Sequence, residues 1–276
     1  MEQLRKVQLL QLEILKEVDR ICKKNNINYF LTGGTLLGAI RHKGFIPWDD
    51  DLDIGMTREN YDKFIEVAQN ELLDKYFLQN GDTEKNFALM FSKIRINDTI
   101  YQEKNSKDVK IHQGIFIDIF PYDNKITDID KLHKQNKRIS FYRLMLLTKA
   151  KYNIYRTDNK IKKICYEIFK IMVKFISAKS LKNKLQKEAT SYNNEKDSTE
   201  ILNWSTSYTY DKEIMKKEWI QDYRYEEFEG EKFMVPLQAE KFLEQLYGDY
   251  MKLPPEDQRY NRHGIQKIDL GEYDKK

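Results

Sequence analysis

One segment constrains this chain more than any other, because it combines a glycine pair, a short basic stretch and a dense group of carboxylates. It covers residues 30–55 and reads FLTGGTLLGAIRHKGFIPWDDDLDIG, with Asp49, Asp50, Asp51 and Asp53 inside five positions. Like charges this close repel each other, and folded proteins keep them mainly where a cation or a positive ligand neutralises them. The segment therefore predicts a site for a metal ion and a phosphate-containing substrate.

The acidic group runs into an alternating pattern. Leu52 and Ile54 alternate with Asp51 and Asp53, and this two-residue period predicts a strand over residues 51–56. Carboxylates at positions i and i+2 of a strand point the same way and can share a cation. Because carboxylate oxygens are hard ligands, Mg2+ or Mn2+ suits this pair better than zinc.

A third carboxylate stands in another apolar segment. Residues 114–120 read GIFIDIF, which predicts a buried strand that Pro121 ends. An unpaired carboxylate inside such a strand is costly, so Asp118 is the predicted partner of Asp51 and Asp53. We expect these three residues to hold the metal and to be catalytic, with Asp118 bridging metals or accepting the proton of an attacking hydroxyl. A buried structural ion pair is the alternative for Asp118.

The glycine pair precedes a predicted helix over residues 35–42. Gly33 and Gly34 let the backbone approach a phosphate closely. The N-terminus of the helix, with Thr35 near its start, would help to hold that phosphate. These three residues are therefore predicted to bind substrate.

Three alternative roles for the acidic group fit the sequence less well. Solvated acidic loops are common, but such a loop needs neither the strand alternation nor the glycine pair. An EF-hand that starts at Asp49 would place Ile54 where glycine is required and Asn60 where glutamate is required. A Walker P-loop needs Gly-Lys-Ser/Thr, which the chain lacks.

The composition argues against several classes of protein, namely nucleic-acid-binding, disulfide-rich, zinc-binding, secreted and membrane-spanning proteins. The 276 residues are 40% apolar and 33% charged, and the net charge of +4 is too small to indicate a nucleic-acid partner. The two cysteines, Cys22 and Cys165, lie far apart and suggest neither a disulfide framework nor a zinc site. The sequence shows no signal peptide and no apolar run of about 18 residues. The expected location is cytoplasmic, either soluble or peripheral on a membrane.

The order of predicted elements indicates an α+β fold. Helical spacing covers residues 4–24, and a strand over 87–97 is expected to form a hairpin with 100–104. Residues 128–193 lack glycine and proline and predict long helices. We therefore expect a mixed-sheet core with flanking helices and an inserted helical region.

The helical region is strongly basic. Residues 149–187 hold twelve lysines and arginines against two acids, a net charge of +10. An apolar stripe at helical spacing runs through them, at Ile161, Ile164, Cys165, Ile168, Phe169, Met172, Phe175 and Ile176. Two interpretations stay open. The helix lies on an anionic membrane, or it is an ordinary helix that turns this stripe to the core and its lysines to water.

Several motifs resemble the LicD family of the nucleotidyltransferase-fold superfamily. The glycine pair followed by Asp-Leu-Asp-Ile at 51–54 is similar to the superfamily pattern. Residues 34–51, GTLLGAIRHKGFIPWDDD, resemble the more specific LicD version. Residues 114–121 (GIFIDIFP) and 254–259 (PPEDQR) resemble two further segments of the family.

This resemblance implies an enzyme that transfers a substituted phosphate from a CDP-linked donor to a sugar hydroxyl and releases CMP. Bacterial members move phosphocholine from CDP-choline to precursors of teichoic acid or lipopolysaccharide, and fukutin-type members move ribitol or glycerol phosphate. The acceptor would be a lipid-linked glycan at the inner face of the membrane. The chain would then comprise a nucleotidyltransferase-like catalytic core at 1–126, an acceptor- or membrane-facing region at 127–200, and a segment at 201–276 that completes the active site.

The resemblance gives Asp51, Asp53 and Asp118 the same metal-binding roles. The diphosphate or acceptor contacts that it implies are basic residues, namely Arg41, Lys43, Lys93, Arg95, Arg259 and Arg262. From the residues alone, Lys93 and Arg95 on one face of a strand suit phosphate binding and solvent exposure equally. A nucleotidyltransferase that releases pyrophosphate and an inactive membrane-surface scaffold are the alternative functions.

Overall fold

The computed structural model of the chain describes residues 2–154, 159–205, 212–261 and 264–275. The α-helices are α1 (Glu2–Asn25), α2 (Gly33–His42), α3 (Arg58–Glu71), α4 (Ile129–Lys149), α5 (Lys160–Lys174), α6 (Ala178–Ala189) and α7 (Ala239–Tyr247). The strands are β1 (Phe30–Leu31), β2 (Asp53–Thr57), β3 (Tyr76–Gln79), β4 (Ser92–Ile96), β5 (Ile100–Glu103), β6 (Phe116–Asn124), β7 (Glu200–Leu202), β8 (Ile214–Lys216), β9 (Tyr223–Phe228), β10 (Glu231–Pro236) and β11 (Ile265–Asp269). Short 3-10 helices occupy Lys217–Trp219, Glu256–Gln258 and Gly271–Lys275.

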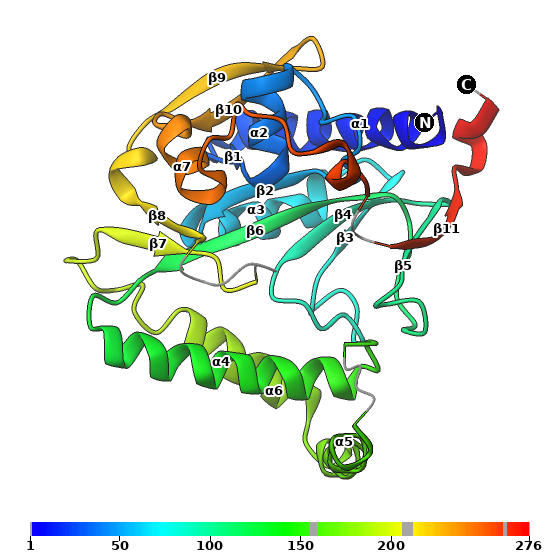
Figure 1. Cartoon of the computed structure of the whole chain (residues 1–276), viewed down its shortest axis with the longest axis vertical. Helices are drawn as coiled ribbons and strands as arrows, with labels where there is room; N and C mark the ends of the chain where they lie inside the picture. Colours follow the sequence, from blue (N-terminus) through cyan, green and yellow to red (C-terminus); the bar gives the residue numbers. More distant parts are fainter. Residues whose placement is uncertain (1, 155–158, 206–211, 262–263, 276) are drawn as a thin grey trace.

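Within these residues the largest sheet has seven strands, in the order β1-β2-β6-β4-β3 with β7 and β8 added beside β6 (Figure 1). β2 and β6 run parallel, whereas the remaining neighbouring pairs of this sheet are antiparallel. The β9–β10 hairpin and the β5–β11 pair stand outside it. A mixed sheet with helices packed against it confirms the predicted α+β fold.

The main hydrophobic core lies between the sheet and two helices. α1 contacts α3, β4 and β6, and α3 contacts β2 and β6. Val7, Ile14, Val18 and Ile21 recur at helical spacing along α1 and are fully buried, which is why this face of the helix packs inward. The core therefore supports the two parallel strands that carry the predicted carboxylates.

The helical region forms a second hydrophobic cluster. α4 packs against α6, and α5 packs against α4 at the outer edge of the molecule (Figure 1). Leu132, Ile139, Leu181 and Leu185 fill this cluster together with Trp204. The long helices predicted from the lack of glycine and proline are present. None of the helices in the described ranges is both long and apolar enough to cross a membrane.

The predicted hairpin between residues 87–97 and 100–104 is wrong. β4 pairs with β3 and β6, whereas β5 pairs with β11 near the C-terminus. The chain does turn at Asp98, where φ is +57°, but the strands on either side of this turn take partners that are distant in sequence. Strand preferences depend on the neighbours that tertiary structure supplies, so a local pattern could not identify these partners.

Two predicted strand limits are also wrong. β2 begins at Asp53, so Asp51 lies in the preceding loop instead of in the strand. β6 continues past Pro121, which does not end it. Antiparallel pairing with β4 stops at Ile119 and pairing with β7 starts at Asp123. On the edge of β6 that faces β4 and β7, Pro121 therefore falls between two ladders, where no N–H is required. On the other edge it stays in the parallel register, opposite Met56 of β2.

Candidate active site

The parallel pairing of β2 and β6 brings two predicted carboxylates together. Asp53 opens β2 and stands opposite Asp118 in the register. On the other side of β6, Lys93 of β4 also stands opposite Asp118, and Lys93 Nζ lies 3.0 Å from Asp118 Oδ1. Three neighbouring strands therefore present Asp53, Asp118 and Lys93 in one row across the sheet.

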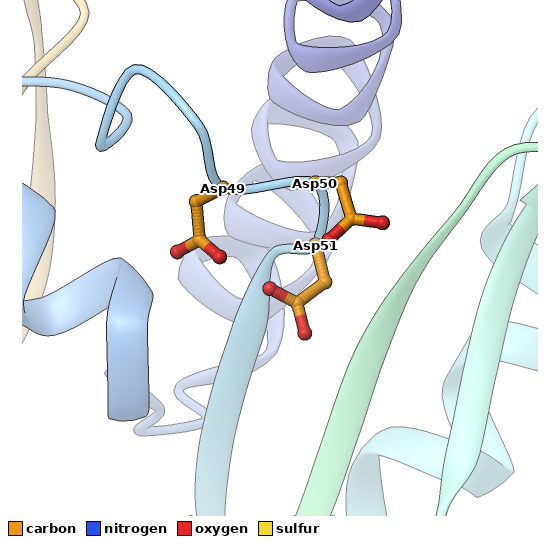
Figure 2. Close-up of side chains that lie close together, drawn as sticks. All are labelled: Asp49, Asp50 and Asp51. Atoms are coloured by element: carbon orange, nitrogen blue, oxygen red, sulfur yellow. The ribbon is translucent and has the colours of Figure 1, made fainter. Parts of the chain in front are cut away.

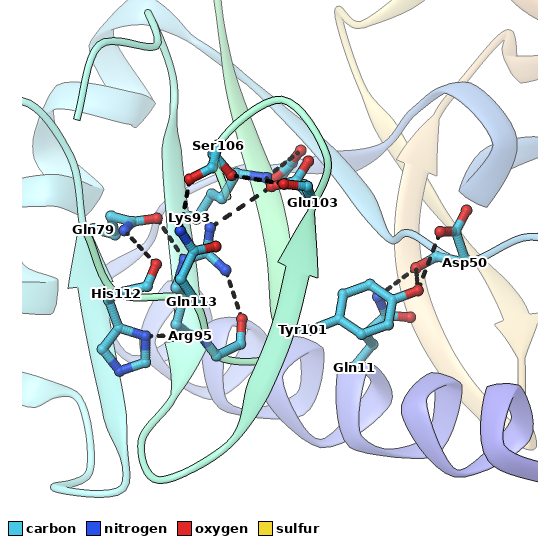
Figure 3. Close-up of polar contacts among 12 residues, drawn as sticks. Gln11, Asp50, Gln79, Lys93, Arg95, Tyr101, Glu103, Ser106, His112 and Gln113 are labelled. Atoms are coloured by element: carbon cyan, nitrogen blue, oxygen red, sulfur yellow. Dashed lines mark hydrogen bonds and ion pairs between the residues drawn. The ribbon is translucent and has the colours of Figure 1, made fainter. Parts of the chain in front are cut away.

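The acidic loop before β2 is held by side chains from distant elements. Gln8 and Gln11 of α1 donate from Nε2 to the carbonyl oxygens of Asp49 (2.9 Å) and Asp50 (3.0 Å). The Tyr101 hydroxyl donates to Asp50 Oδ2 at 3.1 Å (Figure 3). Asp49, Asp50 and Asp51 each offer one carboxylate oxygen that lies within 4.8 Å of those of the other two (Figure 2). These buried hydrogen bonds fix the loop, so its consecutive carboxylates take defined directions.

The glycine pair lies directly against these carboxylates. Gly33 has a φ of +56°, which favours glycine, and a Cβ built there would lie 3.3 Å from Asp53 Oδ2. A Cβ built at Gly34 would lie 2.5 Å from Asp49 Oδ2. Thr35 Oγ1 accepts a hydrogen bond from the Asp53 backbone N–H at 2.8 Å. The positive end of α2 therefore touches the acidic residues and partly offsets their charge.

Asp53 has the environment of a metal ligand. Its Oδ1 is buried and accepts no hydrogen bond from any residue that the structure describes. Burial raises the pKa of Asp53 well above its ordinary value, and the carboxylates of Asp51, Asp118 and Asp49 raise it further, with Lys93 opposing. A buried carboxylate oxygen without a hydrogen bond, among like charges, is costly. A divalent cation that prefers oxygen ligands fits this set of residues.

Asp118 forms the ion pair that was one of the two interpretations of its sequence, and its metal-binding role stays a prediction. The Lys93 ammonium pairs with Asp118 and lies 3.3 Å from the centre of the Phe116 ring. It is also 3.3 Å from Glu103 Oε2 (Figure 3). The structural ion pair is therefore present, and Asp118 also stands beside Asp53. Burial raises the pKa of Asp118 to about 6, opposed by the charge of Lys93. A carboxyl group with such a pKa can exchange a proton near neutral pH.

Arg95 lies two residues after Lys93 but has a different role. It donates from Nε to Gln79 Oε1 and from Nη1 to the Gly114 carbonyl, both at 2.5 Å (Figure 3). Its guanidinium carbon is 4.6 Å from the centre of the Phe116 ring. Both Lys93 and Arg95 are 1% exposed, so solvent exposure, one of the two interpretations kept for them, is wrong. Lys93 pairs with the carboxylate of Asp118, whereas Arg95 links β4 to Gln79 of β3 and to the Gly114 carbonyl.

Arg41 and Lys43 lie away from the aspartates of the candidate site. They stand at the C-terminal end of α2 and just beyond it, a full helix length of about 15 Å from the glycine pair. Arg41 donates to the Tyr250 carbonyl at 2.5 Å, and Lys43 Nζ is 3.3 Å from Glu226 Oε2. In this conformation these two cations tie α2 to the C-terminal part of the chain.

The C-terminal motif returns to the acidic loop. The Arg259 guanidinium lies over the Trp48 ring, 5.7 Å from its centre, and Trp48 directly precedes Asp49. Arg259 Nε also donates to the Pro254 carbonyl at 2.8 Å. Arg262, the second basic residue predicted in this segment, lies outside the described residues.

The sequence analysis assigned no individual role to three residues that lie at the site. The strand alternation starts at Asp51 and does not include Asp49, which only the folded loop brings against Gly34. Gln8 and Gln11 escape notice although they lie on the buried face of an amphipathic helix. Buried amide groups need hydrogen-bond partners, so polar residues on that face are a usable signal.

The metal-free protein is expected to lose stability as the pH rises through about 6. The folded pKa of Asp118, about 6, exceeds the ordinary value of 3.8. Protonated Asp118 therefore stabilises the fold below pH 3.8, and this contribution of about 3 kcal/mol is lost as the pH rises through the folded pKa. Urea unfolding in EDTA at several pH values, compared between wild type and Asp118→Asn, isolates this contribution. The same pH dependence in both proteins would contradict the expectation.

Sequence comparison with known proteins finds relatives that share the segments forming this site. Residues 26–153 match the family described as LicD/FKTN/FKRP, nucleotidyltransferase domain. The lipopolysaccharide cholinephosphotransferase LicD of Haemophilus influenzae is 34% identical over 270 residues, covering 94% of this chain and 96% of that protein. An uncharacterised protein of Rickettsia typhi is 32% identical over 120 residues, 43% of this chain and 37% of that protein. The human ribitol 5-phosphate transferase FKRP is 42% identical over 48 residues, 17% of this chain and 10% of that protein.

The similarity to the Haemophilus influenzae protein determines the family, and the match over residues 26–153 agrees with it. The matched range 26–153 contains the glycine pair, the acidic loop, Lys93 and Asp118. The similarity to the Haemophilus influenzae protein extends over nearly the whole of both chains. The chain therefore belongs to the LicD family of phosphotransferases.

Proposed function

We propose that this enzyme transfers phosphocholine from CDP-choline to a sugar hydroxyl of a lipid-linked glycan precursor, with a divalent metal ion and with release of CMP. The acceptor is of the lipopolysaccharide or teichoic acid type, at the cytoplasmic face of the membrane. The observation that carries the proposal is Asp53, whose Oδ1 is buried without a hydrogen bond from any described residue, and which lies among further carboxylates with Gly33 beside it. The similarity to a cholinephosphotransferase supports phosphocholine as the transferred group.

The residues around Asp53 would hold Mg2+ or Mn2+. Asp51 and Asp53 would be its ligands with Asp118 as the third carboxylate, and Asp49 offers an oxygen within 4.8 Å of one from Asp51. When bound, the ion would neutralise the charge of the donor diphosphate and polarise the phosphoryl group that is transferred. The backbone N–H groups at the start of α2 can receive phosphate oxygens beside it.

The proposed transfer forms one bond and breaks one bond at phosphorus. The acceptor oxygen bonds to the phosphorus of the phosphocholine group, and the bond from that phosphorus to the bridging oxygen of the diphosphate breaks. CMP leaves with the bridging oxygen. The hydroxyl proton passes to Asp118, whose pKa of about 6 suits it to take up and release a proton. Lys93, 3.0 Å away, holds this carboxylate in position.

Binding and product analysis test this function. CDP-choline, CDP-glycerol, CDP-ribitol and CTP are titrated into the enzyme by calorimetry with and without Mg2+, and the nucleotide product is then identified. Mg2+-dependent preference for CDP-choline with CMP as product is expected. Preference for another CDP-alcohol would change the transferred group but keep the reaction class. Pyrophosphate release from CTP would identify a nucleotidyltransferase, and no nucleotide binding would indicate an inactive scaffold.

Gly34→Ala is expected to lower turnover by about 10- to 100-fold with little change in stability. Its Cβ would meet Asp49 Oδ2 at 2.5 Å, so the carboxylate must move. Alanine favours a helix by up to about 1 kcal/mol over glycine, which offsets part of the strain. Gly81→Ala is the matched control, because its Cβ would meet only the flexible Lys182 side chain. Equal turnover in both variants would contradict a role for Asp49.

A further inference from the structure

α5 exposes an apolar face that no described element covers. Six large apolar side chains on it or at its C-cap are more than half exposed, from 54% for Ile168 to 86% for Phe175. They are Ile161, Ile164, Ile168, Ile171, Met172 and Phe175. Their spacing of three and four residues places them on one side of the helix. Exposed Cys165 falls within the same stripe. Soluble proteins rarely leave so continuous an apolar surface in water.

A different side of α5 makes the contact with the protein. Val173 is 1% exposed, and Phe169 and Ile176 are partly buried in the second hydrophobic cluster. Lys149 of α4 donates from Nζ to the carbonyls of Val173 and Lys174. The predicted stripe therefore divides in two. Its edge packs inward, but most of it faces outward, so the interpretation that turned the stripe to the core is wrong.

The charges around this apolar face identify the chemistry of its partner. α5 holds five lysines against one glutamate, and Lys160, Lys162, Lys163 and Lys174 are all exposed. An apolar stripe bordered by lysines matches a bilayer surface, where the apolar side chains enter the acyl boundary and the ammonium groups reach lipid phosphates.

We propose that α5 docks the enzyme on the surface of an anionic phospholipid membrane. At 15 residues and with five lysines, the helix suits the plane of the interface, since a span needs about 20 apolar residues. A second copy of the chain is a poorer partner, because pairing two α5 faces would bring like charges together. This docking requires no turnover, so it can hold or fail independently of the proposed reaction.

The chain carries a natural labelling site for this test. Cys165 is exposed on the stripe, whereas Cys22 is buried and burial raises the pKa of its thiol, so it reacts slowly. An environment-sensitive fluorophore on Cys165 is expected to shift to the blue with vesicles of phosphatidylcholine containing about 30% phosphatidylglycerol. Pure phosphatidylcholine vesicles should give a much smaller shift. No shift with either composition would overturn the proposal.

Variants of the unlabelled enzyme distinguish binding through this face from nonspecific adsorption to vesicles. Ile164→Glu/Ile168→Glu is expected to sediment with the anionic vesicles at least about tenfold more weakly than wild type. Leu9→Glu/Leu73→Glu, at exposed leucines in α1 and two residues beyond α3, should bind like wild type. Both variants should keep the wild-type melting temperature. Equal loss in both, or a wild-type dimer that only the α5 variant makes monomeric, would overturn membrane docking.

Discussion

Asp53→Asn is expected to reduce turnover by about a thousandfold or more while making the metal-free protein more stable. Asparagine keeps the size of the side chain but removes a buried negative charge from the neighbourhood of Asp51, Asp118 and Asp49. Relief of this repulsion should raise the free energy of unfolding at neutral pH by about 1–3 kcal/mol. Urea unfolding in EDTA measures the gain, and CMP release from CDP-choline measures the loss.

The same substitution at Asp123, a buried aspartate, provides the control. Asp123 is 2% exposed, but Arg58 donates to both of its carboxylate oxygens at 2.8 Å. Asp123→Asn should therefore lower stability, because the Arg58 guanidinium would keep one oxygen acceptor but lose the second one and the negative charge. Opposite signs at Asp53 and Asp123 would separate a functional carboxylate from a structural one. A less stable Asp53→Asn protein, or one with full turnover, would refute the assignment.

Arg95→Met is expected to destabilise the protein by about 3–5 kcal/mol. The substitution removes the donors to Gln79 and the Gly114 carbonyl and leaves both acceptors buried. It also removes the cation 3.9 Å from Glu103. Thermal and urea unfolding measure the effect. The folded fraction should keep the wild-type KM for the donor, because Arg95 is enclosed by protein.

Arg259→Met is compared with Arg95→Met, both for its effect on stability and for its effect on the KM for the donor. Its side chain is 29% exposed and lies over Trp48, beside the acidic loop. A partly exposed arginine should cost less than about 1 kcal/mol of stability, whereas loss of a diphosphate contact should raise the KM for the donor. A stable Arg95→Met protein with a raised KM would restore Arg95 as a substrate contact.

Much of the site was predictable because its signals are local. The carboxylates of Asp53 and Asp118 stand out in apolar segments, where an unpaired charge is costly. Gly33 was predicted from its place before a helix, and the structure gives it the positive φ that glycine tolerates. The partner of β5 and the passage of β6 through Pro121 were not predictable, because both depend on strands that are distant in sequence.

The sequence by itself determined which chemistry the chain can perform. Glycine is required where the backbone must approach a phosphate or take a positive φ. Clustered carboxylates, and a carboxylate in an apolar strand, are unfavourable unless a cation or another partner neutralises them. Tertiary structure decided which groups meet. Parallel pairing sets Asp118 beside Asp53. The burial of β4 pairs Lys93 with Asp118 and directs Arg95 to the Gly114 carbonyl. Among the described residues, packing leaves the apolar face of α5 exposed. Burial and proximity are properties of the whole fold, so no local pattern could contain them.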